Sequence, residues 1–157
     1  NATLLDAGPI DRGVWTGRRG ESTYIPKNAK LRELLKSYGV EGVTYENNIP
    51  DFMKFVVNIQ GDDGQIYAGI VTITGMAGGK TGRISVNFPK ATLALSQKSG
   101  IPTAVINKLI ADKKLTWHEC NDMKTMILIP TVINQEFGHM GGVGEINLLF
   151  DLLEGKL

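Results

Sequence analysis

The residues best suited to chemistry lie in one short window near the end of the chain. It holds both histidines, His118 and His139. Glu119 follows the first histidine, and Asn134 lies between the two. Two imidazoles and an amide oxygen are suitable ligands for one divalent metal ion, with Mg, Mn and Zn all plausible. A neighbouring carboxylate can act as a base on water. The spacing alone leaves open that these are ordinary structural residues.

The elements around this window predict a strand, a returning strand and a helix. Residues 115–118 have the pattern of a short strand, and residues 123–129 form the returning strand after an Asn-Asp turn. Pro130 suits the first turn of a helix, which Gly138 should end. A tight hairpin packed on a helix can bring its polar side chains to one point.

His118 and Asn134 should meet at that point. His139 is five residues after Asn134, so it is not a neighbour on a regular helix and must turn back after Gly138. Trp117 alternates with His118 along the strand. We therefore expect one face of this strand to be buried and the other to carry the site.

The remaining sequence predicts a mixed α+β fold in a single domain, residues 1–157. Residues 1–26 lack a clear hydrophobic periodicity, which predicts a largely irregular arm. A turn at 61–64 should join two strands as a hairpin, and a Gly-rich loop at 75–82 should join the second strand to a third. The expected helices cover 28–38, 89–98, 102–113 and 145–154, and the expected strands cover 52–60, 65–74 and 83–88.

Charge divides the chain unevenly, although the net charge is only +1. Residues 1–114 carry a balance of +5 and residues 115–157 a balance of −4. The basic part could meet phosphates, and the acidic end could hold a cation. The candidate phosphate contacts are Arg18 and Arg19 in the arm, and Lys80 and Arg83 at the Gly-rich loop. An ordinary uneven surface with solvated or paired side chains remains the alternative.

Composition excludes several classes of protein. A hydrophobic content of 42% is ordinary for a globular domain. The single cysteine, Cys120, excludes an internal disulfide and a Cys-rich zinc site. No apolar run approaches the roughly 20 residues that span a bilayer, so we expect no membrane insertion.

The motifs in the last third of the chain resemble the HNH/endonuclease VII superfamily of toxin nucleases, most closely the branch named for a Trp-His-His signature. The similar segments are Leu115 to Met126, Ile129-Pro130 and Gly138 to Gly142, with weaker similarity at Trp15 to Ser22, at Gly39 to Val43 and at Ile49 to Phe52. The resemblance implies a ββα-metal finger over residues 115–142, an N-terminal α+β part over 1–114 and a C-terminal helix in 143–157.

The resemblance also implies roles for individual residues. His118, Asn134 and His139 are similar to the metal ligands, and Glu119 is similar to the general base. Two departures stand out: the pair is His-Glu instead of His-His, and Asn134 stands where a His is expected. Asn is a weaker ligand and cannot act as a base. The sequence leaves open whether Asn134 is natural or a change that silences a toxin.

The implied activity is metal-dependent hydrolysis of a phosphodiester by an endonuclease, with DNA favoured and RNA second. The implied context is the toxin domain of a bacterial competition protein. Such a domain is secreted or delivered as part of a larger toxin, acts in the target-cell cytoplasm and is neutralised by a cognate immunity protein. The alternative is a non-catalytic domain that keeps the fold and only binds a partner.

Overall fold

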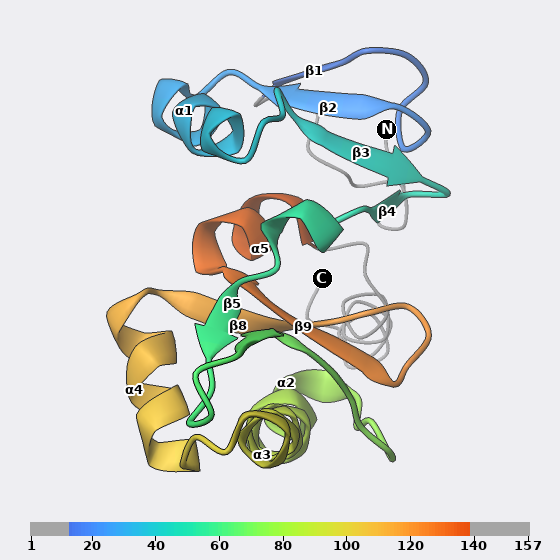
Figure 1. The fold of residues 1–157 in the computed structure, drawn as a ribbon. Coiled ribbons are helices and arrows are strands. Elements are labelled where there is room, and N and C mark those ends of the chain that lie inside the picture. The colour runs from blue at the N-terminus through green and yellow to red at the C-terminus, as the bar shows by residue number, and fades with distance from the viewer. Residues whose placement is uncertain (1–12, 139–157) are drawn as a thin grey trace.

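The computed structural model describes residues 13–138, and the predicted helix 145–154 lies outside them. This part of the chain is a mixed α+β fold with several small antiparallel sheets, as the sequence predicts (Figure 1). One layer holds the first sheet and α1, and a second sheet lies between α5 on one side and α3 on the other.

The first sheet has the strand order β1-β2-β3-β4. Its elements are β1 (Gly13–Trp15), β2 (Thr23–Pro26), β3 (Val43–Glu46) and β4 (Ile49–Pro50), with α1 (Ala29–Ser37) between β2 and β3. The helix predicted at 28–38 is confirmed, and Asn28 caps it by accepting from the Leu31 N–H. The irregular arm is wrong from residue 13 onward, because β1 and β2 pair there as a hairpin, with the Trp15 ring packed against Tyr24 and Tyr45.

The second sheet has the order β7-β9-β8, so β8 is an edge strand. Its elements are β7 (Ile70–Thr72), β8 (Leu115–Glu119) and β9 (Thr125–Pro130), and they follow η2 (Met53–Phe55) and a separate hairpin of β5 (Asn58–Gln60) and β6 (Ile66–Ala68). The hairpin predicted around the turn at 61–64 is confirmed. The run 52–60 is only partly strand, because η2 occupies its first half.

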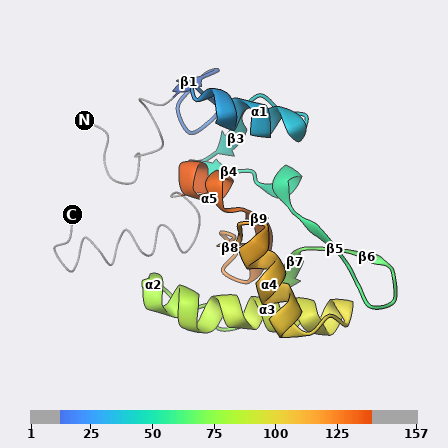
Figure 2. The ribbon, with the colours of Figure 1, turned by 90° about the vertical axis from the view of Figure 1, so that its left-hand side faces the viewer.

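The remaining elements are helical: α2 (Gly79–Gly82), the π-helical turn η3 (Arg83–Asn87), α3 (Phe88–Ser99), α4 (Thr103–Asp112) and α5 (Thr131–Phe137). The first three run on as one rod in Figure 2. The predicted strand at 83–88 is therefore wrong, and the Gly-rich loop ends in helix. The alternation of apolar and polar residues over 83–88 does not match their burial, since Ile84 is 55% exposed while Asn87 is fully buried.

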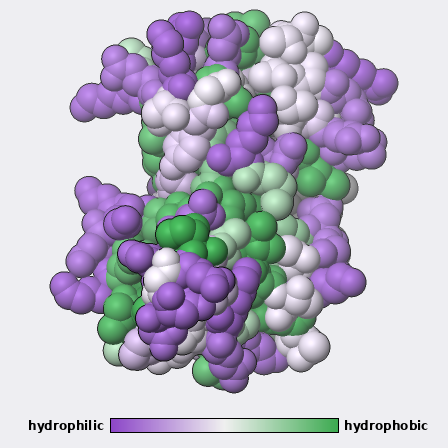
Figure 3. Space-filling model, viewed as in Figure 1, coloured by the Kyte–Doolittle hydropathy of each residue, from purple (hydrophilic) through white to green (hydrophobic). Residues whose placement is uncertain are grey.

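Both faces of the second sheet are buried. Ile127 and Ile129 of β9 pack into a core with α1, α5 and the first sheet. Met126 and Leu128 pack into another core with α3 and α4. Trp117 and His118 thus lie on opposite faces, but both faces are buried, since period-2 alternation separates two cores here instead of core from solvent. In Figure 3, hydrophobic residues gather across the middle of the face shown, and the end that carries α1 is mostly hydrophilic.

None of the helices formed by residues 13–138 has both the length and the apolar character needed to span a bilayer.

Candidate functional site

The structure brings His118 and Asn134 together, as the sequence predicts. His118 lies near the end of β8, and Asn134 lies on α5, which follows β9 directly. The imidazole Nδ1 donates to Asn134 Oδ1 at 2.8 Å, which leaves the lone pair on Nε2. The β8, β9 and α5 elements thus form the predicted strand, strand and helix, with one polar contact joining the first strand to the helix.

The surroundings of His118 are apolar. Its ring packs edge-on against Phe52 with centroids 4.8 Å apart, and the side chain is buried. Burial lowers the pKa of His118 to about 4, with Arg83 adding to the decrease and the Asn134 hydrogen bond opposing it. The imidazole is therefore neutral near pH 7, which is the form that binds a metal.

Glu119, the next residue, forms an ion pair with Arg83 of η3. Arg83 Nε lies 3.2 Å from Glu119 Oε1. The N–H is not aimed at that oxygen, because neither atom has a hydrogen-bond partner within the described part of the chain. Burial raises the pKa of Glu119, while the positive charge of Arg83 opposes the increase.

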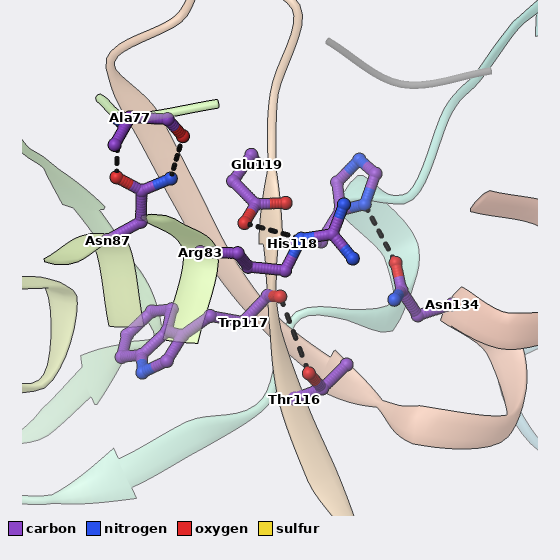
Figure 4. Close-up of polar contacts among 8 residues, drawn as sticks. All are labelled: Ala77, Arg83, Asn87, Thr116, Trp117, His118, Glu119 and Asn134. Atoms are coloured by element: carbon purple, nitrogen blue, oxygen red, sulfur yellow. Dashed lines mark hydrogen bonds and ion pairs between the residues drawn. The ribbon is translucent and has the colours of Figure 1, made fainter. Parts of the chain in front are cut away.

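His118 and Glu119 lie on opposite faces of β8. His118 is paired with Ile127 and faces the α5 side, whereas Glu119 is paired with Met126 and faces the α3 side. In Figure 4 the Arg83 side chain passes from the Glu119 side of the strand toward His118. Among residues 13–138, β8 is an edge strand, so no described strand lies on that side of it. The two predicted functional residues thus have separate partners, Asn134 for His118 and Arg83 for Glu119.

His118 and Asn134 can supply two of the three ligands that are expected for a divalent metal ion. His118 Nδ1 and Asn134 Oδ1 are already within 2.8 Å of each other. If the ring proton moves to Nε2, both atoms present lone pairs to one cation. No three His, Cys, Asp or Glu side chains within residues 13–138 could hold a metal. A site here therefore needs Asn134 and a residue such as His139, which lies outside the described range.

The other predicted phosphate contacts are spread over the molecule. Lys80 is exposed on α2, one short helix before Arg83. Arg18 and Arg19 lie in the turn between β1 and β2, in a different sheet from His118 and Glu119. Of the four basic residues, Arg83 lies at the candidate site, where it contacts Glu119.

Asn87 is a buried polar residue, four positions after Arg83, that the sequence analysis missed. It is fully buried and forms two hydrogen bonds to Ala77. A strand over 83–88 would place residues 83 and 87 on one face but about 13 Å apart. Helical spacing would have made them neighbours, since residues four apart lie next to each other on a helix.

The chain was compared with family models, curated proteins and solved structures. Residues 42–141 match the model of the DNase/tRNase domain of colicin-like bacteriocin. No curated protein and no solved structure shows a significant match. The matched range begins just before β3 and contains Arg83, His118, Glu119 and Asn134. Because it spans more than half of the sequence, this chain belongs to the family of DNase/tRNase domains of colicin-like bacteriocins.

Proposed function

We propose that this chain is a metal-dependent endonuclease of the HNH type, the toxin domain of a delivered bacterial competition protein. The observation that carries the proposal is the contact between His118 and Asn134 at the junction of two strands and a helix. Membership in a family of DNase/tRNase domains supports the same activity. We interpret β8, β9 and α5 as the ββα-metal finger.

His118, Asn134 and His139 are the proposed ligands of one divalent metal ion. The neutral imidazole and the amide oxygen fit Mg, Mn or Zn. When bound, the metal would offset negative charge that develops on the scissile phosphate. The edge-on contact with Phe52 restricts the His118 ring, so the imidazole loses little conformational entropy when it adopts its metal-binding orientation.

Glu119 is the proposed base that takes a proton from the attacking water. Burial favours its protonated form, and this makes the carboxylate a stronger base than an exposed one. Arg83 is the proposed phosphate contact, since its side chain is 28% exposed and a guanidinium can bind two phosphate oxygens at once. When Arg83 turns from Glu119 to the phosphate, the carboxylate is released to accept a proton.

The cleavage test uses the purified chain with supercoiled DNA and with tRNA, each with added Mg, Mn or Zn and with a chelator. We expect DNA to be cleaved with metal and protected by the chelator. The matched control is Lys108→Ala, which removes only an exposed ion pair with Asp112 on α4. Cleavage of tRNA alone would reassign the substrate to RNA, and cleavage that is unaffected by the chelator would refute the metal.

A second candidate function is partner binding without catalysis. It is favoured by the engagement of both central side chains, His118 with Asn134 and Glu119 with Arg83. Asn134→His discriminates the two functions. Rapid cleavage by the variant together with an inactive parent would identify the parent as a silenced nuclease domain. Metal-dependent cleavage by the parent at the rate of the variant would refute the partner-binding alternative.

The proposed partner in the producing cell is an acidic immunity protein. The balance of +5 over residues 1–114 would attract an acidic surface, and opposite potentials speed association. Co-expression with the product of the reading frame directly downstream should yield a complex whose association rate falls steeply with salt. No complex at low salt and micromolar concentration would contradict this assignment.

A further inference from the structure

A pocket of about 440 Å³ lies between the start of α3, α4 and the edge strand β8. One of its walls is the Trp117 indole, whose Nε1 donates to Thr92 Oγ1 at 3.1 Å, so the ring is held in place. Phe88 and Ile110 add further apolar surface. Pockets of roughly 300–1,000 Å³ with mostly apolar walls and a few polar groups are typical of small-ligand sites.

Polar side chains from α4 complete this pocket. Thr103 and Asn107 both line it, and they are neighbours on the helix because they are four residues apart. Both are exposed, and neither side chain forms a hydrogen bond within residues 13–138. The Asn amide carries two donors and one acceptor, a set that can form two hydrogen bonds with the edge of a nucleobase.

The pocket also reaches the outer edge of β8. Thr116 and Trp117 lie on different sides of the strand in Figure 4, yet both line the pocket. Backbone hydrogen bonds at Lys114 and Cys120 show that the even-numbered residues pair with β9, so the Trp117 backbone faces away from it. The Trp117 carbonyl accepts one long bond, from Thr116 Oγ1 at 3.4 Å. Among residues 13–138 no strand covers this edge, so the Trp117 N–H and the second lone pair of its carbonyl are open to a ligand.

The proposed phosphate contact adjoins the pocket. Ile84, which lines the pocket, follows Arg83 directly. Glu119, the partner of Arg83, is two residues after Trp117 on the same face of β8, which is about 7 Å along the strand. A ligand that carries both a planar ring and a phosphate can therefore reach the pocket and Arg83 together.

We propose that this pocket is a nucleobase site, which receives an unpaired base of the substrate while Arg83 contacts a phosphate. The proposal rests on the nuclease activity in the proposed function, and it names the substrate class as single-stranded or locally unpaired nucleic acid. Proteins bind unpaired bases by stacking and by hydrogen bonds to their edges. Phe88 and Trp117 supply the apolar walls, and Asn107 and the backbone of Trp117 supply the polar groups. A base within an intact duplex must first unpair and unstack to enter.

Filling the pocket tests the proposal through binding instead of cleavage. Thr103→Trp adds an indole at the pocket, and Ala104→Trp adds the same side chain at an exposed neighbour that does not line it. In chelator, Thr103→Trp should weaken binding of a fluorescent single-stranded DNA of about eight nucleotides by about 5- to 150-fold, the effect of losing one stacked base. The slope of log affinity against log salt should stay the same, because the phosphate contacts remain. Equal affinities of the two variants would overturn the proposal.

An abasic oligonucleotide of the same length completes a double-mutant cycle, since it keeps every phosphate and loses every base. The parent should bind it more weakly than the normal strand. Thr103→Trp should then cause little further loss, because base and pocket form one interaction. Asn107→Ala should weaken binding of the normal strand alone, and its thermal unfolding should match that of the parent because residue 107 is exposed. Equal weakening of both oligonucleotides by Thr103→Trp would refute a base in the pocket.

These measurements separate the pocket from the proposed function. A chain that cleaves DNA, but whose Thr103→Trp and Ala104→Trp variants bind DNA equally, keeps the nuclease assignment and loses the nucleobase site. A chain that never cleaves, but binds the normal strand through the pocket, supports the nucleobase site and refutes only catalysis. An extended peptide is the other ligand that an open strand edge can take. If Thr103→Trp loses the complex with the downstream protein and retains oligonucleotide binding, the pocket belongs to a protein partner and the proposal is overturned.

Discussion

The two faces of β8 carry different chemistry. On one face His118 is surrounded by Phe52 and Asn134 and is uncharged near pH 7, because burial lowers its pKa to about 4. On the other face Glu119 is paired with Arg83. Adjacent residues thus belong to separate compartments, one neutral and suited to metal binding, the other charged and suited to proton transfer.

In the proposed mechanism, an edge strand serves one reaction from both sides. A central strand would be flanked by neighbours along its whole length, whereas among residues 13–138 β8 has a paired strand on one side only. The separation also predicts that the two compartments can be disabled one at a time.

The largest expected effect is on the Glu119 face. Glu119→Gln keeps the shape of the side chain but loses its basicity, so the cleavage rate should fall by about 10²–10⁴-fold. Metal affinity should stay the same, because the proposed ligands His118 and Asn134 lie on the other face. Rates from single-turnover cleavage and affinities from calorimetry check both, with the exposed Glu33→Gln as the control. A rate within about threefold of the parent, far below the usual range, would remove Glu119 from the base role.

The second effect is on the His118 face. Replacing His118 and His139 together with Ala should reduce metal affinity by more than about 100-fold, beyond what loss of a ligand's hydrogen-bond partner causes. Calorimetric titration with Mn or Zn measures this change. The Arg83 to Glu119 pair should persist, since it lies on the opposite face. Unchanged stoichiometry and affinity would eliminate the metal site.

A matched pair of stability variants compares the two cores. Tyr45→Phe removes the hydroxyl that donates to the Phe137 carbonyl, and Thr92→Val removes the acceptor for Trp117. Each leaves one buried polar group unsatisfied and should cost about 1–3 kcal/mol. At about 2–4 °C per kcal/mol for a chain of this size, thermal unfolding resolves both losses. Only Tyr45→Phe should also weaken metal binding, because Phe137 lies on the helix of Asn134. Equal weakening by both would show that the cores are coupled.

The smallest effect concerns substrate contact at the edge. Arg83→Ala should weaken DNA binding, measured in chelator to prevent cleavage, and should reduce the slope of log affinity against log salt by about 1. Lys108→Ala, on the remote face of α4, is the control. A slope equal to that of the parent would mean that Arg83 serves only Glu119 and does not contact phosphate.

Local sequence signals predicted several parts of the fold. Asn28 before a leucine stripe predicted α1, and the turn at 61–64 predicted the β5–β6 hairpin. Pro130 after an apolar strand predicted the start of α5, and so the meeting of His118 with Asn134. These features depend on caps, turns and prolines, whose effects extend over only a few residues.

The helical form of residues 83–87 and the burial of both faces of β8 were decided only by tertiary structure. The alternation from Arg83 to Phe88 fits a strand, but the hydrogen bonds between Asn87 and Ala77 accompany a helical turn. The sequence itself identified the candidate residues for the chemistry, because residue types and short spacings are local. It could not determine that His118 and Glu119 lie on opposite faces of the strand, with Arg83 paired to Glu119. That depends on two cores built from segments far apart in the chain.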